Sequence, residues 1–481
     1  MRLRYILSAA AALTAIALLA TEPVNPSPPD NDDSEELDAD ADTIAADNDE
    51  DDRNVRENPV IEYDDEIDIP VPSFINRSIN HINLNGADWS SLRSAIAQCA
   101  LSPVTIIHIG DSHIQADIAT GTTRDLLQYD YGNAGRGIIT PLKMSGTNEP
   151  RDYTFTGSGT WDALKLMKAP WKRTMGFTGT SVHPCSASSR FSVGTTTRST
   201  VADDDYDPFT SMLIFHHGKL NITEVTDAND NHVDFKAIPS HDYTQLILSR
   251  PLDKATVDFD TNGDLTLYGV SLTADRPGII YSAIGNNGAT YDTYNRVGTL
   301  GSGISPLHPA LVIISLGGNE AFGRLDTRAF IRNVDRLVSN IRQSNPDAQI
   351  LLVTPMECHK SIYTTKYVKK KVPVKSRKRG KKGRKKKSKT TYVTKNVKTK
   401  VKSYGVNTNV APLREALLQY GADNNIAVYD WYNVAGGKGA SNTWISNGLF
   451  STDRVHHSAK GYHIQGRLLY EALIEQLGRP Q

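Results

Sequence analysis

The stretch VTIIHIGDSHIQ, residues 104–115, decides the fold. Its first six residues form a β-branched apolar run, which is typical of a buried parallel strand. Gly110, Asp111 and Ser112 follow at once, and we expect a helix from about Gln115 to Leu127. The turn between strand and helix places Ser112 at the carboxyl end of a strand, where open α/β sheets have their sites.

The same α/β pattern continues in the second half of the chain. Apolar runs at 311–316, 350–353 and 426–429 predict further buried strands. An amphipathic helix is expected where Phe330, Val334, Leu337 and Ile341 share one face. Two more helices are expected at 412–420 and 461–477. The sequence therefore predicts an α/β fold, with a three-layer α/β/α, flavodoxin-like domain and a mainly parallel sheet.

Residues 151–273 have a different sequence pattern. Helical periodicity is absent, and short strand-like runs alternate with Asp, Asn and Gly turns. This pattern predicts a β-sandwich. Its predicted strands are 212–215, 233–237, 245–249, 256–259 and 265–272. We expect an inserted domain that divides the α/β domain into a first part, 67–150, and a second part, 274–481.

The first 66 residues predict export and a linker. Residues 1–20 combine Arg2 and Arg4 with an apolar run, which is the layout of a signal peptide. An uncleaved anchor is the alternative, and only then would the chain be held in a membrane. Residues 21–66 are rich in Asp and Glu, with few large apolar residues, so a disordered linker is expected there. The expected location is the periplasm or the cell envelope.

Charge is segregated along the chain, although the formal net charge is only −1. Residues 366–402 contain 19 Lys and Arg and no Asp or Glu. This basic insertion suggests adhesion to an anionic envelope polymer. A surface insertion without a partner, or one neutralised by the acidic linker, is the alternative. Nucleic acid is not favoured, because only Tyr367 and Tyr392 interleave with the lysines. The valine-rich ends of the insertion are able to pair as a hairpin.

Cysteine and histidine spacing predicts no metal site and no cofactor. The three cysteines, Cys99, Cys185 and Cys358, are too few for a disulfide framework in an exported chain. No CxxC motif or Cys/His spacing points to zinc. We expect at least one buried thiol and at most one disulfide.

Three short motifs carry candidate chemistry: 110–112, 317–320 and 453–456. A serine hydroxyl needs a neighbouring base, and His456 can serve Ser112 in this way. Asp453, three residues earlier, can orient the imidazole. The Asn319 amide and backbone N–H groups can stabilise a developing oxyanion. His113 is expected to be a loop or rim residue rather than a second base.

These motifs resemble those of the SGNH (GDSL) hydrolase family, whose blocks include Gly-Asp-Ser, Gly-x-Asn-Asp and Asp-x-x-His. The residues on its catalytic positions are Ser112, Asn319, Asp453 and His456. The resemblance implies an oxyanion hole of Ser112, Gly288 and Asn319, with Gly285 as the other candidate for the second-block glycine. Glu320 departs from the family pattern, which has Asp there.

A narrower resemblance is to envelope peptidoglycan O-acetylesterases that carry a carbohydrate-binding-like insertion. It rests on 108–117, 132–137 and 318–321, and on the position of the β insertion. It implies a serine esterase that removes O-acetyl groups from a carbohydrate, peptidoglycan or another glycan, through an acyl-serine intermediate. One alternative is an O-acetyltransferase that uses the same residues. The other is a non-catalytic binding protein that uses the basic insertion and the β domain.

Overall fold

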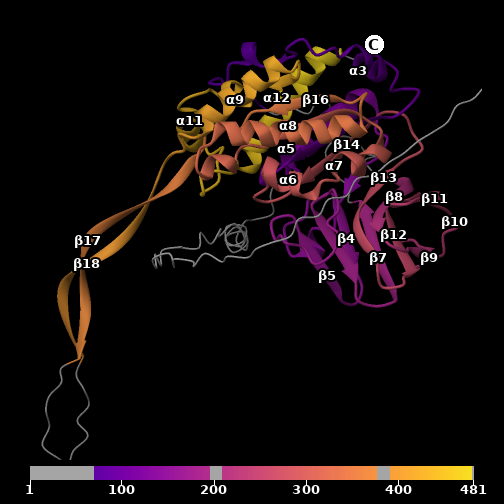
Figure 1. Cartoon of the computed structure of the whole chain (residues 1–481), viewed down its shortest axis with the longest axis horizontal. Coiled ribbons are helices and arrows are strands. Elements are labelled where there is room, and N and C mark those ends of the chain that lie inside the picture. Colours follow the sequence, from indigo (N-terminus) through magenta and orange to yellow (C-terminus); the bar gives the residue numbers. More distant parts are fainter. Residues whose placement is uncertain (1–69, 196–207, 376–389, 479–481) are drawn as a thin grey trace, which may run out of the picture. The chain divides into compact units, whose positions relative to one another are not determined.

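The structure, a computed structural model, describes residues 70–195, 208–375 and 390–478 (Figure 1). The predicted signal peptide, 1–20, and the acidic linker, 21–66, lie outside these residues. No helix within the described ranges has the length and apolarity needed to cross a membrane.

A six-stranded sheet forms the centre of the α/β domain, in the order β1-β19-β16-β15-β2-β14. All neighbouring pairs are parallel except β1 with β19. The predicted strand 104–109 is confirmed as β2, and all seven of its residues are buried. Burial on both faces is expected when helices cover both sides of a parallel sheet. The strands are β1 (Ile82–Asn83), β2 (Val104–Gly110), β14 (Ile279–Gly285), β15 (Pro309–Ser315), β16 (Gln349–Val353) and β19 (Ala427–Tyr429).

The helices form two groups on this sheet (Figure 1). In one group α12 packs on α3 and α5, and in the other α8 packs on α6, α7 and α9. The predicted apolar face of α8 is confirmed, since its buried residues include Phe330, Val334, Leu337 and Ile341. The helices are α3 (Ser90–Ala97), α4 (Ser112–Gln115), α5 (Ile118–Tyr131), α6 (Tyr291–Val297), α7 (Leu300–Ile304), α8 (Thr327–Ser344), α9 (Val410–Asp423), α10 (Trp431–Val434), α11 (Ala440–Ser446) and α12 (Ala459–Leu477).

The helix after β2 differs from the one predicted at 115–127. It begins at Ser112 and is divided into α4 and α5, because Asp117 has a left-handed conformation with φ 53°. The buried Asp117 carboxylate accepts two hydrogen bonds from Arg124, each 2.9 Å long. This tertiary contact stabilises a backbone conformation that a local helical pattern does not predict.

The insertion consists of two antiparallel sheets. One has the order β10-β11-β8-β13-β6-β5, with β3 added beside β13, and the other has the order β4-β7-β12-β9. Their facing side chains share one apolar core, which includes Phe155, Phe191 and Phe259 from the second sheet and Val182 and Ile214 from the first. Two sheets that bury one core between them form the expected β-sandwich.

The strands of these two sheets include one, β3, that precedes residue 151. They are β3 (Gly137–Ile139), β4 (Tyr153–Gly157), β5 (Trp161–Lys165), β6 (Thr180–Pro184), β7 (Ser188–Thr195), β8 (Phe209–His217), β9 (Asn221–Thr226), β10 (Phe235–Pro239), β11 (Tyr243–Leu252), β12 (Lys254–Asp260) and β13 (Thr266–Thr273). β3 lies in the segment assigned above to the first α/β part, yet it pairs with β13. The boundaries 151 and 273 remain a prediction.

The basic insertion lies within a hairpin of two paired strands, β17 (His359–Lys375) and β18 (Thr390–Val406) (Figure 1). They pair in antiparallel register from His359 with Val406 to Lys375 with Thr390. The predicted hairpin pairing of the valine-rich ends is therefore confirmed. All three cysteines are free, and the expectation of a buried thiol is confirmed at Cys99 and Cys358.

Candidate active site

The candidate site lies where four loops meet at the carboxyl edge of the parallel sheet. Ser112 follows β2, Gly288 follows β14, and Asn319 follows β15. The fourth loop, which contains 453–456, precedes α12. Because β2 pairs with both β14 and β15, the ends of these three strands lie side by side.

The structure brings Ser112, His456 and Asp453 into direct contact. Ser112 Oγ lies 2.7 Å from His456 Nε2. The opposite ring nitrogen, His456 Nδ1, lies 2.5 Å from Asp453 Oδ2. Asp453 Oδ1 accepts hydrogen bonds from the Ser451 hydroxyl and from the backbone N–H groups of Val455 and His456. The three side chains are thus linked in the order that base-assisted serine chemistry requires.

The charge of Asp453 controls the protonation of this group. Burial tends to raise the pKa of Asp453, but its hydrogen bonds, the one with His456 first, hold that pKa well below the usual value. Burial tends to lower the pKa of His456, but the hydrogen bond and the charge of Asp453 outweigh burial. The net pKa of His456 therefore lies above its usual value. A carboxylate that stabilises the imidazolium strengthens His456 as a base.

Two glycines allow the helix of the nucleophile to approach the sheet. A Cβ atom at Gly110 would lie 2.2 Å from the Ile114 side chain and 2.8 Å from the Ser315 carbonyl oxygen. A Cβ atom at Gly285 would lie 2.1 Å from the backbone nitrogen of Gln115. A side chain at either position would force α4, and Ser112 with it, away from the strand ends.

The same packing separates the two candidates for the second-block glycine. Gly285 ends β14 under α4, whereas Gly288 lies in the following loop with φ 78°. Only Gly288 is in the loop that faces Asn319, since Asn319 Nδ2 donates to the carbonyl oxygen of the next residue, Ala289, over 3.0 Å. The oxyanion role of Gly288 remains a prediction.

The Asn319 amide is held by two acceptors. Nδ2 donates to Ala289 O and also to Asp111 Oδ2, over 3.1 Å. An amide nitrogen has only two hydrogens. Asn319 can therefore donate to an oxyanion only after one of these contacts is released. The contact with Ala289 connects this release to movement of the loop that contains Gly288.

Asp111 and Gln115 are functional candidates that the sequence reasoning missed. Asp111 is buried between its two donors, the Asn319 amide and the backbone N–H of His113. Burial raises the pKa of Asp111 to about 6. Gln115 Oε1 accepts the backbone N–H of Asn287 over 2.7 Å, and Gln115 Nε2 donates to Asn148 Oδ1 over 2.7 Å. Gln115 thus connects α4 to the loops on either side of it.

Glu320, which departs from the family pattern, has a structural contact. Its Oε1 accepts the backbone N–H of Tyr291, the first residue of α6, over 2.8 Å. Burial raises the pKa of Glu320 to about 7. The longer side chain therefore caps the helix that follows the Gly288 loop.

His113 is half-buried in the first turn of α4, beside the base. Its ring centroid lies 5.1 Å from that of His456 and 5.5 Å from that of His457. Its Nδ1 lies 3.1 Å from the Tyr462 hydroxyl oxygen. Burial, assisted by the two neighbouring histidines, lowers the pKa of His113 well below its usual value. A neutral His113 packs beside the base without adding a second positive charge.

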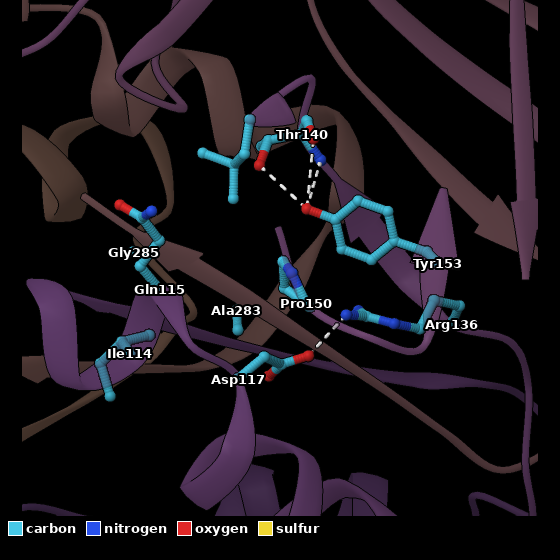
Figure 2. A pocket seen from close by; sticks show the side chains of 10 residues that line it. Ile114, Gln115, Asp117, Arg136, Thr140, Pro150, Tyr153, Ala283 and Gly285 are labelled. Carbon is cyan, nitrogen blue, oxygen red and sulfur yellow. Dashed lines mark hydrogen bonds and ion pairs between the residues drawn. The ribbon is translucent and has the colours of Figure 1, made fainter. Parts of the chain in front are cut away.

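A cluster of four buried charges lies behind the site, between α5 and the insertion. Figure 2 shows Asp117 and Arg136 in the small pocket that this cluster borders. Asp117 pairs with Arg124 and Arg136, and Asp152 pairs with the same two arginines. All four side chains are at most 5% exposed. Their charges balance, as buried ions require.

Among the described residues, no group of three or more His, Cys, Asp and Glu side chains is arranged to hold a metal ion. The histidines nearest the site instead contact aromatic rings. His457 packs between Trp444 and Phe450, with ring centroids 5.0 Å apart in both cases.

Comparisons with known proteins agree with this geometry. Residues 260–464 match the GDSL-like Lipase/Acylhydrolase family, a range that includes Asn319, Asp453 and His456. Ser112 precedes that range, on the other side of the insertion. No curated protein matches the sequence.

Solved structures extend the similarity to the insertion. A peptidoglycan O-acetylesterase is similar over 84% of this chain and 99% of its own, with a TM-score of 0.60 and 20% identity. A carbohydrate esterase of family two from Clostridium thermocellum, in complex with cellohexaose, covers 68% of this chain and 99% of its own, with a TM-score of 0.27 and 11% identity. A lipase/acylhydrolase from Enterococcus faecalis covers 42% of this chain and 80% of its own, with a TM-score of 0.27 and 17% identity.

The first of these structures establishes that the fold is shared, whereas the TM-scores of the other two are too low to support a conclusion. The matched family and the shared α/β fold with its inserted β domain agree with each other. The resemblance to GDSL/SGNH hydrolases is therefore confirmed by the family match over residues 260–464 and by the shared fold.

Proposed function

We propose that the chain is a serine esterase that removes O-acetyl groups from a carbohydrate through an acyl-serine intermediate. The contact of Ser112 Oγ with His456 Nε2, with Asp453 on the opposite ring nitrogen, carries this proposal. The fold shared with a peptidoglycan O-acetylesterase, insertion included, supports the choice of a glycan ester.

In the first half of the reaction, Ser112 Oγ attacks the carbonyl carbon of the acetyl ester. His456 Nε2 accepts the hydroxyl proton over the existing 2.7 Å contact, and Asp453 stabilises the imidazolium. The bond from the carbonyl carbon to the sugar oxygen then breaks, and His456 returns the proton to that oxygen. The acetyl group remains on Ser112 as an ester.

In the second half, a water molecule replaces the sugar. His456 accepts a proton from the water as it attacks the acetyl-serine carbonyl carbon, and the proton returns to Ser112 Oγ when acetate leaves. A sugar hydroxyl in place of water would give acetyl transfer, which is the alternative activity.

The negative oxygen in both halves needs donors. The backbone N–H of Ser112 lies in the first turn of α4, where N–H groups have no acceptor within the helix. The backbone N–H of Gly288 and the Asn319 amide complete the proposed oxyanion hole. Since Asn319 already donates to Asp111 and Ala289, we propose that the substrate oxygen replaces Ala289 O as its second acceptor.

The insertion reaches this site directly. Met167, which follows β5, lies against Gly288: a Cβ atom at that glycine would be 3.6 Å from Met167 Cε. Met167 is nevertheless 43% exposed, so its side chain borders the open side of the loop. A residue of the β domain beside a candidate oxyanion donor is consistent with a substrate that contacts both domains.

The test compares purified protein with the Ser112→Ala variant. Acetate release is followed from an activated acetyl ester and from O-acetylated peptidoglycan. We expect release by the unaltered protein and its loss in the variant. Acetyl transfer to an added glycan without free acetate would identify a transferase instead. Identical behaviour of the two proteins, with no turnover, would contradict the esterase proposal and favour a non-catalytic binding protein.

We also propose that the protein is exported to the periplasm or the cell envelope, on the evidence of residues 1–20. Mass spectrometry of the N-terminus after expression with an export machinery tests this. A mature chain that begins near residue 21 is expected, whereas an intact Met1 on a membrane-bound protein would indicate an anchor.

A further inference from the structure

The register of β17 and β18 separates the side chains of the basic hairpin onto two faces. Successive residues of a strand point to opposite faces, and directly paired residues share a face. Tyr363 pairs with Lys402, and Tyr367 pairs with Lys398. One face therefore combines aromatic rings with cations, and we name it the tyrosine–lysine face. Its tyrosines and its described lysines are Tyr363, Tyr367, Tyr392, Tyr404, Lys369, Lys371, Lys398, Lys400 and Lys402.

The opposite face has a different composition. Val368 pairs with Val397, and Val372 pairs with Val393, so this face has an apolar stripe. We name it the valine face, and its members include Ile362, Val368, Val372, Val393, Val397 and Val401, with Lys360, Lys366, Lys370 and Lys395. No tyrosine of the described hairpin lies on it.

The tyrosine–lysine face begins at the catalytic loop. The guanidinium carbon of Arg454, the residue after Asp453, lies 4.7 Å from the centre of the Tyr404 ring. Lys402 Nζ lies 5.1 Å from the centre of the same ring. The carbonyl oxygen of Arg454 accepts the backbone N–H of His359, the first residue of β17. The base of the hairpin thus contacts the loop that holds His456.

Exposure and charge define the ligand that fits this face. Tyr363, Tyr367 and Tyr392 are 63%, 73% and 64% exposed, although large aromatic rings gain most when they are covered. The lysines among them are exposed and no acidic residue lies between 366 and 402. Aromatic rings can cover the apolar faces of sugars, and ammonium groups pair with carboxylates. A chain of sugars that carries carboxylate groups satisfies both requirements.

We propose that the tyrosine–lysine face binds an anionic glycan chain, and that this chain is the polymer whose acetyl ester reaches Ser112. The second clause depends on the proposed esterase function. Continuity with the catalytic loop favours this ligand over nucleic acid or a lipid surface. Only a polymer that is also the substrate needs to lie along the hairpin and at His456 together.

The hairpin provides a matched pair of variants for the test. Lys369→Gln, Lys371→Gln and Lys398→Gln remove three charges from the tyrosine–lysine face. Lys366→Gln, Lys370→Gln and Lys395→Gln remove three charges from the valine face at similar positions along the strands. Each triple variant changes the net charge by the same amount. Any difference in binding or KM between them therefore comes from the face that lost its lysines, and not from the total charge.

The assay measures acetate release from O-acetylated pectin, which carries carboxylates, from neutral acetylated glucomannan and from p-nitrophenyl acetate. We expect the first triple variant to raise KM for pectin about tenfold and the second to raise it less than threefold. Neither variant should change kcat/KM for glucomannan or p-nitrophenyl acetate, which also shows that both fold. The difference in KM for pectin between the two triple variants should disappear in 0.5 M NaCl, because salt screens exposed charges.

Equal increases of KM for pectin in the two triple variants would overturn the proposal, because the effect would then not depend on which face carries the lysines. So would tighter retention of the protein by DNA or by anionic phospholipid vesicles than by pectin. Co-sedimentation of the Ser112→Ala protein with pectin, with and without each triple change, measures binding without turnover. If no ester is hydrolysed, the esterase proposal fails, but co-sedimentation still shows whether the tyrosine–lysine face binds the glycan.

Discussion

Asp453→Asn is the change that most directly tests the roles of the candidate catalytic residues. The two oxygens of Asp453 have separate partners. Oδ1 accepts hydrogen bonds from Ser451, Val455 and the backbone of His456, whereas Oδ2 faces His456 Nδ1 at 2.5 Å. An asparagine can keep all the contacts of Oδ1 and place its NH₂ group where Oδ2 was. The loop should therefore keep its conformation.

The imidazole, in contrast, must change its tautomer. An NH₂ group donates to Nδ1, so the ring proton moves to Nε2, the nitrogen that faces Ser112 Oγ at 2.7 Å. A protonated Nε2 cannot accept the serine proton. We expect kcat/KM to fall about 10⁴-fold, which corresponds to about 5.4 kcal/mol of transition-state stabilisation.

The pH profile gives an independent measurement. The pKa of His456 lies above its usual value because of Asp453, and the neutral ring is the active base. In the unaltered protein, kcat/KM should rise with pH through an apparent pKa above about 6.5. Without the carboxylate the cation is less stable, so the residual activity of Asp453→Asn should rise at a lower pH.

The assay is hydrolysis of p-nitrophenyl acetate between pH 5 and 9, corrected for the spontaneous reaction. Ser451→Ala is the matched control, because it removes one hydrogen bond to Asp453 Oδ1 and keeps the carboxylate. We expect kcat/KM of the Ser451→Ala control to fall less than tenfold. A loss below tenfold in Asp453→Asn, with an unchanged pH profile, would refute the assignment of Asp453 as the partner of His456.

Three further changes test the residues around this group. Asn319→Ala should lower kcat by about 10²–10³-fold with little change in KM for a small ester, and a loss confined to KM would contradict an oxyanion role. Glu320→Gln should raise the thermal midpoint more at pH 8 than at pH 5. The buried carboxyl, with a pKa near 7, stabilises the fold only while protonated and loses this contribution as pH rises from about 4.5 to 7. Gln115→Leu leaves the backbone N–H of Asn287 without its acceptor, so it should lower the free energy of unfolding by about 1–3 kcal/mol in denaturant titration. An equal midpoint change at pH 5 and pH 8 in Glu320→Gln would contradict the raised pKa of Glu320. An unchanged free energy of unfolding in Gln115→Leu would show that the contact with Asn287 is unimportant.

Local sequence signals predicted much of the fold and the three residues now in contact. The strand at 104–110 and the helix face of α8 follow from hydrophobic periodicity within single segments. Ser112 and His456 are 344 residues apart, yet both could be identified because each lies in a short motif at the end of an element. Their 2.7 Å contact itself is a product of the parallel sheet.

Contacts between distant segments could not be predicted in this way. The break in the helix at Asp117 depends on Arg124 and Arg136, whose side chains meet it only in the folded chain. The tyrosine–lysine face needs the strand register, because Tyr363 and Tyr404 lie outside 366–402 and appear beside its lysines only when β17 pairs with β18. The roles of Asp111 and Gln115 depend on loops that follow other strands.

These long-range contacts also explain how an insertion can contribute to an active site. Buried ion pairs add little stability compared with apolar packing, but the loss of one partner is costly, so they favour a single geometry. Asp117, between α4 and α5, and Asp152, just before β4, share the same two arginines, Arg124 and Arg136. This shared pairing fixes β4 of the insertion relative to the helix that begins at Ser112. Met167 can then stay beside the loop that contains Gly288, because a displaced insertion would break buried ion pairs such as Arg124–Asp152.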